Sequence, residues 1–241
     1  MANHPAPGIA DYYRGLGLPA SAWEIGEEHP SLEQLGLRVL AATSHARILE
    51  LGVQSGGFAV PVILAAATRP QFSYTGVDNL QYTNAVPLHL VEAYLRLAGV
   101  TAELRLIERD STPVLRTLSP SSFDLILIDH YKPKYPLDLY LICSRNLLSD
   151  DGVILLHDVL THAAGPWKVC MRVCRAFGYT WVVDTNVSQG AAVVRRNRGA
   201  SRAGGLATLV GIEVRLRWYA HAAVLAARRH VGRILRTLGL R

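Results

Sequence analysis

Short apolar runs alternate with longer amphipathic segments along most of the chain. Continuous apolar runs of about four to eight residues are typical of strands covered on both faces of a parallel sheet. Such runs predict strands at 48–51, 125–128 and 153–156, and further strands are predicted at 72–78, 102–107, 180–184 and 191–195. Helical patterns lie between them, at 58–67, 88–97, 137–148 and 167–177. This alternation predicts an α/β fold, a doubly wound seven-stranded sheet whose ligands bind at the carboxyl ends of its strands.

The two ends of the chain differ from this central pattern. Residues 1–46 predict a helical preface, with helices at 9–16, 21–28 and 31–43, which we expect to act as a lid. Residues 47–196 form the predicted core. Residues 197–241 predict a linker and a basic amphipathic helix over 206–238.

Composition and charge narrow the class of protein. The net charge of +6 is concentrated at the end of the chain, where residues 195–241 hold eleven arginines and one acid, Glu213. Three cysteines without a C-x-x-C pair favour reduced thiols in a cytoplasmic protein. The first residues lack the pattern of a secretory signal, and no apolar run is long enough to span a membrane.

A glycine-rich loop follows the first predicted strand. Gly52, Gly56 and Gly57 leave the backbone open to a ligand, although their spacing is not that of a dinucleotide site. Glu50, just before the loop, would repel a pyrophosphate but suits the cationic amino group of an amino-acid-like ligand. The stretch from Arg47 to Val60 resembles the first motif of the class I S-adenosylmethionine (SAM) methyltransferases, which implies that Glu50, Gly52 and Gly56 bind SAM.

The next two predicted strands also end in acidic residues. Asp78 follows the glycine loop at the distance where an acid accepts hydrogen bonds from ribose hydroxyls. Asp110 and Ser111 follow the third strand, at the place where the SAM methyltransferases contact adenine. The resemblance therefore implies that all three residues bind the cofactor.

A second group of polar residues follows the fourth and fifth strands. Asp129 ends one strand, and His157 and Asp158 end the next. Two carboxylates at one sheet edge repel each other unless a cation or a proton lies between them. We therefore expect a divalent metal, and oxygen ligands favour Mg²⁺.

The run 125–136, followed by 153–159, looks like the Mg²⁺-dependent O-methyltransferases of the catechol type. It is also similar to bacterial methyltransferases that act on glycans and glycosylated natural products. The resemblance implies that Asp129, His157 and Asp158 surround the metal, that His130 lies near SAM, and that Lys132 accepts the proton of the acceptor.

This chain has His157-Asp158 where the catechol type has Asp-Asn. Imidazole suits Mn²⁺ better than Mg²⁺, so either the metal is softer or His157 is a base and not a ligand. Only three lysines occur in the chain, and two of them, Lys132 and Lys134, lie in the loop after Asp129. Beside a metal, Lys132 is expected to have a lowered pKa, as a base requires.

The sequence leaves several functions open. The leading prediction is a SAM-dependent O-methyltransferase acting on a saccharide or glycosylated metabolite; a catechol or phenol is the alternative acceptor. RNA is a further candidate, but the arginines lie outside the core and no Asn-Pro-Pro-Tyr motif for flipped bases is present. A non-enzymatic scaffold would use the basic helix as a membrane tether. The same helix is predicted to contact a membrane surface, its own domain or a second subunit.

Overall fold

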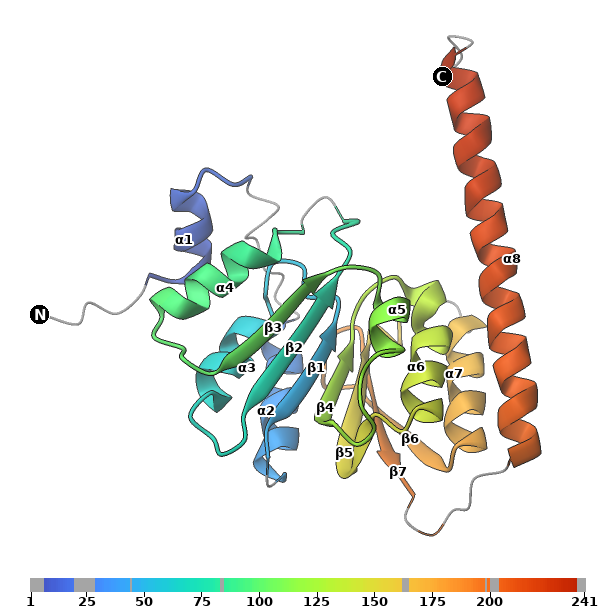
Figure 1. The fold of residues 1–241 in the computed structure, drawn as a ribbon, viewed down its shortest axis with the longest axis horizontal. Coiled ribbons are helices and arrows are strands. Elements are labelled where there is room, and N and C mark those ends of the chain that lie inside the picture. Colours follow the sequence, from blue (N-terminus) through green and yellow to red (C-terminus); the bar gives the residue numbers. More distant parts are fainter. Residues whose placement is uncertain are drawn as a thin grey trace, which may run out of the picture.

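The computed structural model describes residues 7–19, 29–43, 45–82, 85–161, 165–197, 199 and 204–237. One seven-stranded sheet, in the order β3-β2-β1-β4-β5-β7-β6, forms its centre (Figure 1). All neighbouring strands pair in parallel except at β7, which is antiparallel to both β5 and β6. The strands are β1 (Arg47–Leu51), β2 (Ser73–Asp78), β3 (Glu103–Glu108), β4 (Phe123–Ile128), β5 (Leu148–His157), β6 (Tyr179–Asp184) and β7 (Ala191–Arg196).

The predicted doubly wound sheet is confirmed, but the start of β5 was predicted wrongly. Residues 150–152, interpreted as a turn, lie inside β5, which begins at Leu148. Phe123 pairs with Leu148 and Leu125 pairs with Val153, so β5 carries extra residues in an irregular stretch. The preceding helix consequently ends at Ser144 and not at Leu148.

Helices cover both faces of the sheet (Figure 1). Alternate residues of the central strands point to opposite faces: Leu49 packs in one buried cluster and Ile48 in the other. The cluster that contains Ile48 includes α2 (His29–Ala41), α3 (Ala59–Ala66) and α4 (Leu88–Leu97). The opposite cluster includes α5 (Ser111–Leu115), α6 (Tyr135–Ser144), α7 (Gly165–Ala176) and α8 (Gly204–Thr237).

The preface contributes to the core and approaches the glycine loop. In α1 (Ile9–Gly15), the fully buried Tyr13 donates a hydrogen bond to the Ser55 carbonyl oxygen at 3.0 Å. Helix α2 packs against α3 and the sheet. The helix predicted at 21–28 lies outside the described residues, and the role of the preface as a lid stays a prediction.

Helix α8 is one continuous helix of 34 residues. Its first half packs on α6 and α7 through Ala207, Val210 and Val214. Gly211 allows this approach, because a Cβ there would lie 2.5 Å from the Tyr140 hydroxyl oxygen. The second half extends past the body of the molecule (Figure 1).

Candidate active site at the carboxyl ends of the strands

The glycine loop and the end of β4 are in close backbone contact. Asp129 N donates to Leu51 O at 2.8 Å, and Gly52 N donates to Val77 O at 2.8 Å. Gly52 has φ +99°, and a Cβ there would lie 2.0 Å from Asp129 O. Glycine at this position therefore lets β1 and β4 present their ends at one edge.

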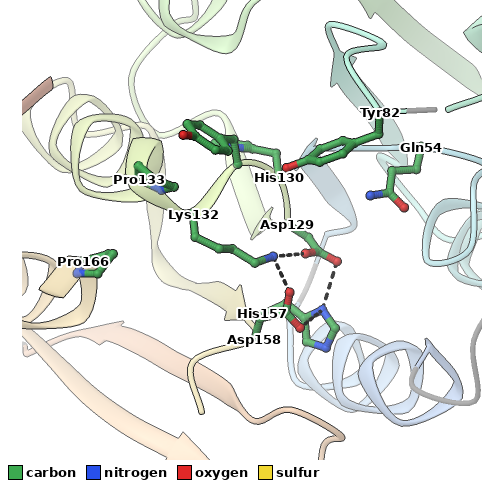
Figure 2. Close-up of a pocket in the computed structure, with 10 residues that line it drawn as sticks. Gln54, Tyr82, Asp129, His130, Lys132, Pro133, His157, Asp158 and Pro166 are labelled. Carbon is green, nitrogen blue, oxygen red and sulfur yellow. Dashed lines mark hydrogen bonds and ion pairs between the residues drawn. The ribbon is translucent and has the colours of Figure 1, made fainter. Parts of the chain in front are cut away.

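A cavity of about 630 Å³ opens at this edge (Figure 2). This volume is within the range of small-molecule sites, roughly 300–1,000 Å³. Its floor is polar and holds the two catalytic residues and the three metal ligands predicted from the sequence. The lining residues are Gln54, Tyr82, Asp129, His130, Tyr131, Lys132, Pro133, His157, Asp158 and Pro166.

Lys132 lies between the two carboxylates. Its Nζ is 3.0 Å from Asp129 Oδ1 and also contacts Asp158 Oδ2. It belongs to the short 3₁₀ helix η2 (Lys132–Lys134) that follows β4. Burial lowers the pKa of Lys132, but the carboxylates of Asp129 and Asp158 raise it more, so the pKa lies above its ordinary value. The lowering expected beside a bound metal stays a prediction.

His157 is buried beside this ion pair. Its Nε2 lies 3.2 Å from the Ser188 carbonyl oxygen, which can only accept a hydrogen bond, so Nε2 carries a proton. Its Nδ1 faces Asp129 Oδ2 at 3.0 Å. Burial lowers the pKa of His157, whereas Asp129 raises it more strongly, and the pKa is raised overall. Nδ1 is thus placed to hold either a proton or a metal against the carboxylates.

The predicted metal ligands fit a divalent cation. One ligand atom from each of Asp129, His157 and Asp158 lies within 4.8 Å of the others. Asp158 Oδ1 is buried and accepts no hydrogen bond from the described residues. A metal-binding histidine usually donates its second ring N–H to a carbonyl or carboxylate, as His157 does to Ser188. The donor set therefore suits Mg²⁺ or Mn²⁺.

A smaller cavity of about 60 Å³ adjoins the first, and both are lined by Tyr82, His130 and Tyr131. Its wall brings together five of the predicted cofactor residues: Gly52, Asp78, Asp110, Ser111 and His130. Asp78 accepts hydrogen bonds from Gln54 N at 2.8 Å and Leu80 N at 2.6 Å. A carboxylate accepts about four such bonds, so Asp78 retains capacity for ribose hydroxyls.

Beneath this cavity, Lys134 ties Asp110 and Ser111 together. Its Nζ lies 2.6 Å from Asp110 Oδ2 and 2.7 Å from Ser111 Oγ. Ser111 Oγ donates to Asp138 Oδ2 at 2.6 Å, and His130 Nε2 lies 2.7 Å from the same oxygen. Burial raises the pKa of Asp110, but Lys134 lowers it more, so this carboxyl is held ionised. The network fixes the positions of Asp110, Ser111 and His130.

Two predicted cofactor residues, Glu50 and Gly56, are not among the described residues that line either cavity. Glu50 is buried, and the Tyr74 hydroxyl donates to its Oε2 at 2.5 Å. Burial raises the pKa of Glu50 to about 8, a rise that the Tyr74 hydrogen bond partly opposes. At Gly56 a Cβ would lie 3.1 Å from Val60 Cγ2, which indicates tight packing. Their contact with SAM stays a prediction.

The structure also adds residues that the sequence did not indicate. Gln54 and Tyr82 come from loops and face the carboxylate cluster (Figure 2). Trp218, on α8, lines the smaller cavity, with its ring 5.9 Å from Lys134 Nζ. One turn further, His221 Nε2 lies 2.6 Å from the Tyr131 hydroxyl oxygen. Helix α8 thus forms part of the site.

Known proteins share this fold. A structure of the Podospora anserina methyltransferase PaMTH1 bound to S-adenosylhomocysteine (SAH) matches with TM-score 0.58 at 18% identity, covering 81% of this chain and 91% of that one. The SAM complex of TomG, an O-methyltransferase of tomaymycin synthesis from Streptomyces achromogenes, matches with TM-score 0.52 at 20% identity, covering 78% of this chain and 87% of TomG. An O-methyltransferase from Bacillus cereus with SAH gives 0.52 at 13% identity, covering 81% and 94%. A search of curated proteins gave no significant match.

The fold is that of the class I SAM-dependent methyltransferases. Residues 49–159 match the model of a methyltransferase domain family. This segment runs from β1 past the end of β5 and contains the predicted metal ligands and all predicted cofactor residues. Over this segment, the family match and the shared fold support an enzyme, a SAM-dependent methyltransferase.

Proposed function

We propose that this methyltransferase transfers the SAM methyl group to a hydroxyl of a saccharide or glycosylated metabolite, with the help of a divalent metal. The observation that carries the proposal is the cluster of Asp129, Lys132, His157 and Asp158 at the floor of the larger cavity. SAM supplies an electrophilic methyl group on a sulfonium. A bound divalent cation supplies positive charge that favours the oxyanion form of a hydroxyl.

The residues of the chain divide into two groups. Asp78, Asp110, Ser111 and His130 would hold the cofactor beside the smaller cavity, and Asp129, His157 and Asp158 would hold the metal. Transfer needs the hydroxyl oxygen within roughly 3–3.5 Å of the methyl carbon, in line with the breaking bond. The two cavities share a wall, which supports such a meeting of donor and acceptor.

Lys132 and His157 are the candidates for accepting the hydroxyl proton. The side chain of Lys132 is 14% exposed and that of His157 only 3%. Lys132 is therefore the more accessible to an acceptor and is our first choice. In the ion pair Lys132 holds its proton, so it must first lose that proton to solvent before it can accept one from the hydroxyl.

The lining of the larger cavity supports a polar acceptor. Gln54, Tyr82 and Tyr131 offer amide and hydroxyl groups above the carboxylates. Tyrosine rings also provide a flat apolar surface beside these donors. Such a mixture suits a saccharide, which has many hydroxyls and apolar ring faces.

Incubating the protein with methyl-labelled SAM and separate panels of sugars, phenols and RNA tests the proposal. We expect label on a sugar oxygen. Label on phenols alone would overturn the saccharide assignment and keep O-methyl transfer. Label on RNA, or no transfer by protein that binds SAM in calorimetry, would contradict the proposed function.

A further inference from the structure

Helix α8 has a second apolar face, turned away from the body. Apolar residues recur along α8 at steps of three or four, which is the spacing of one side of a helix: 209, 212, 216, 220, 224, 227 and 231. We call this the outer face of α8. Its large side chains are exposed: Leu209 by 66%, Leu216 by 64% and Val231 by 52%, with Ile212 and Val224 each exposed by 51%.

The outer face does not take part in the packing of α8. Ala207, Val210 and Val214, which contact the body, lie on the other side of the helix. The helix runs along the edge of the molecule (Figure 1). At ~1.5 Å per residue, α8 is about 50 Å long. The outer face is therefore an extended apolar patch and not a single exposed apolar residue. A partner can therefore cover it without displacing α6 or α7.

Arginines flank this face and no acid opposes them. At ~100° per residue, Arg217 and Arg228 lie roughly 75° to 95° from its centre on one side and Arg215 and Arg233 roughly 125° on the other, whereas Arg229 lies nearly opposite. After Glu213 the chain has seven arginines and no Asp or Glu. Glu213 itself pairs with Arg172 and with Arg217, the latter at 2.9 Å.

This charge pattern selects the partner. Pairing of two copies along α8 would bring two strongly basic helices together, and their like charges would repel. An anionic lipid surface offers apolar chains for the outer face and phosphates for the arginines. Among the described residues, no helix is both long and apolar enough to cross a bilayer.

We propose that α8 binds an anionic membrane surface, lying flat with its outer face among the lipid chains and its arginines at the phosphates. A wide apolar face opposite a basic polar face is typical of amphipathic helices that lie in the plane of the membrane interface. The body of the enzyme then sits on the aqueous side of α8. This attachment is independent of which acceptor the enzyme methylates.

Flotation of the full-length protein with vesicles of phosphatidylcholine, with and without phosphatidylglycerol, tests the proposal. We expect binding only to the anionic vesicles, weakened by salt. Arg228→Gln/Arg233→Gln, one arginine from each side of the outer face, should weaken binding by roughly tenfold or more. Leu216→Ser/Val224→Ser should weaken it by roughly tenfold, because apolar area leaves the lipid.

Matched variants on the body provide the controls. Arg116→Gln/Arg175→Gln removes the same charge from exposed positions, and Leu64→Ser/Leu97→Ser changes exposed apolar residues. Both should bind vesicles as the wild type does, and all four variants should keep wild-type SAM affinity in calorimetry. Equal loss in the control pairs, no binding to anionic vesicles, or a dimer in light scattering that only Leu216→Ser/Val224→Ser dissociates would overturn the proposal.

Discussion

Lys132 lies between two carboxylates that would otherwise repel each other. Its ammonium contacts Asp129 and Asp158, and His157 contacts Asp129 from the other side. The exposed fractions of these side chains, 14% for Lys132 and 16% for each Asp, show that water screens them little. The removal of one carboxylate therefore leaves a poorly solvated cation with only one of its two partners.

Asp158→Asn tests the metal site at this scale. We expect turnover to fall by roughly 100-fold, because a metal ligand is lost, while SAM affinity stays within about twofold. Asp124→Asn is the matched control, since Asp124 is a buried carboxylate on β4 that pairs with Arg47 at 2.8 Å, away from the cavity. It should cost about 3 kcal/mol in the free energy of unfolding and leave turnover per folded molecule unchanged.

Lys132→Arg tests whether Lys132 accepts a proton or only provides the positive charge that balances the two carboxylates. A guanidinium keeps the positive charge beside Asp129 and Asp158 but does not release a proton at accessible pH. We expect turnover to drop by about 100-fold or more, with normal SAM binding. Lys168→Arg, on the exposed side of α7, should have no effect. Near-normal turnover of Lys132→Arg would indicate that His157, and not Lys132, accepts the proton of the acceptor hydroxyl.

The raised pKa of Glu50 predicts how the free energy of unfolding depends on pH. Burial raises its pKa from 4.5 to about 8, so the folded protein retains a proton that the unfolded chain loses. Between these two pKa values the unfolded state binds fewer protons, and the free energy of unfolding falls as pH rises. The total loss is on the order of a few kcal/mol, and Glu50→Gln should remove it. Urea unfolding of both proteins from pH 5 to pH 8 checks this; parallel curves would contradict it.

The elements predicted from sequence bring most of the predicted site residues to one sheet edge in the structure. Asp129, His157 and Asp158 end strands that are buried on both faces, and parallel neighbours present their carboxyl ends at one edge. The fold therefore followed from local apolar runs. The start of β5 did not, because the register of Leu148 against Phe123 depends on the neighbouring strand and not on the local turn signal at 150–152.

Long-range packing explains the residues that sequence analysis missed. Trp218 reaches the smaller cavity because α8 docks on α6 and α7, and no local pattern encodes that contact. Lys134 was noticed only as a neighbour of Lys132. Its burial against Asp110 and Ser111 depends on β3 and β4 ending at the same edge.

Trp218→Ala tests the contribution of α8 to the cofactor site. The ring lines the smaller cavity beside Lys134 and Asp110, and its loss should weaken SAM binding by roughly tenfold. Tyr219→Ala is the control on the same helix, because Tyr219 is 66% exposed. Calorimetric titration with SAM, without lipid, gives both affinities. Equal affinities in the two variants would exclude Trp218 from the site.

At the scale of the whole molecule, one sheet edge collects the residues of the two proposed ligand sites. The proposed cofactor residues come from the ends of β1 to β4, and the proposed metal ligands from the ends of β4 and β5. Tyr82, His130 and Tyr131 line both cavities, so the two proposed sites adjoin each other. Helix α8 borders the same edge and carries the face that we assign to lipid.

The central claim is that Asp129, His157 and Asp158 hold a divalent cation next to SAM. Titrating Mn²⁺ into the SAM-loaded protein, with free Mn²⁺ followed by electron paramagnetic resonance, tests it without an acceptor. We predict one bound ion per chain in the wild type and in Asp124→Asn, and its loss in Asp158→Asn. Absence of binding in the wild type, or equal binding in Asp158→Asn, would contradict the claim.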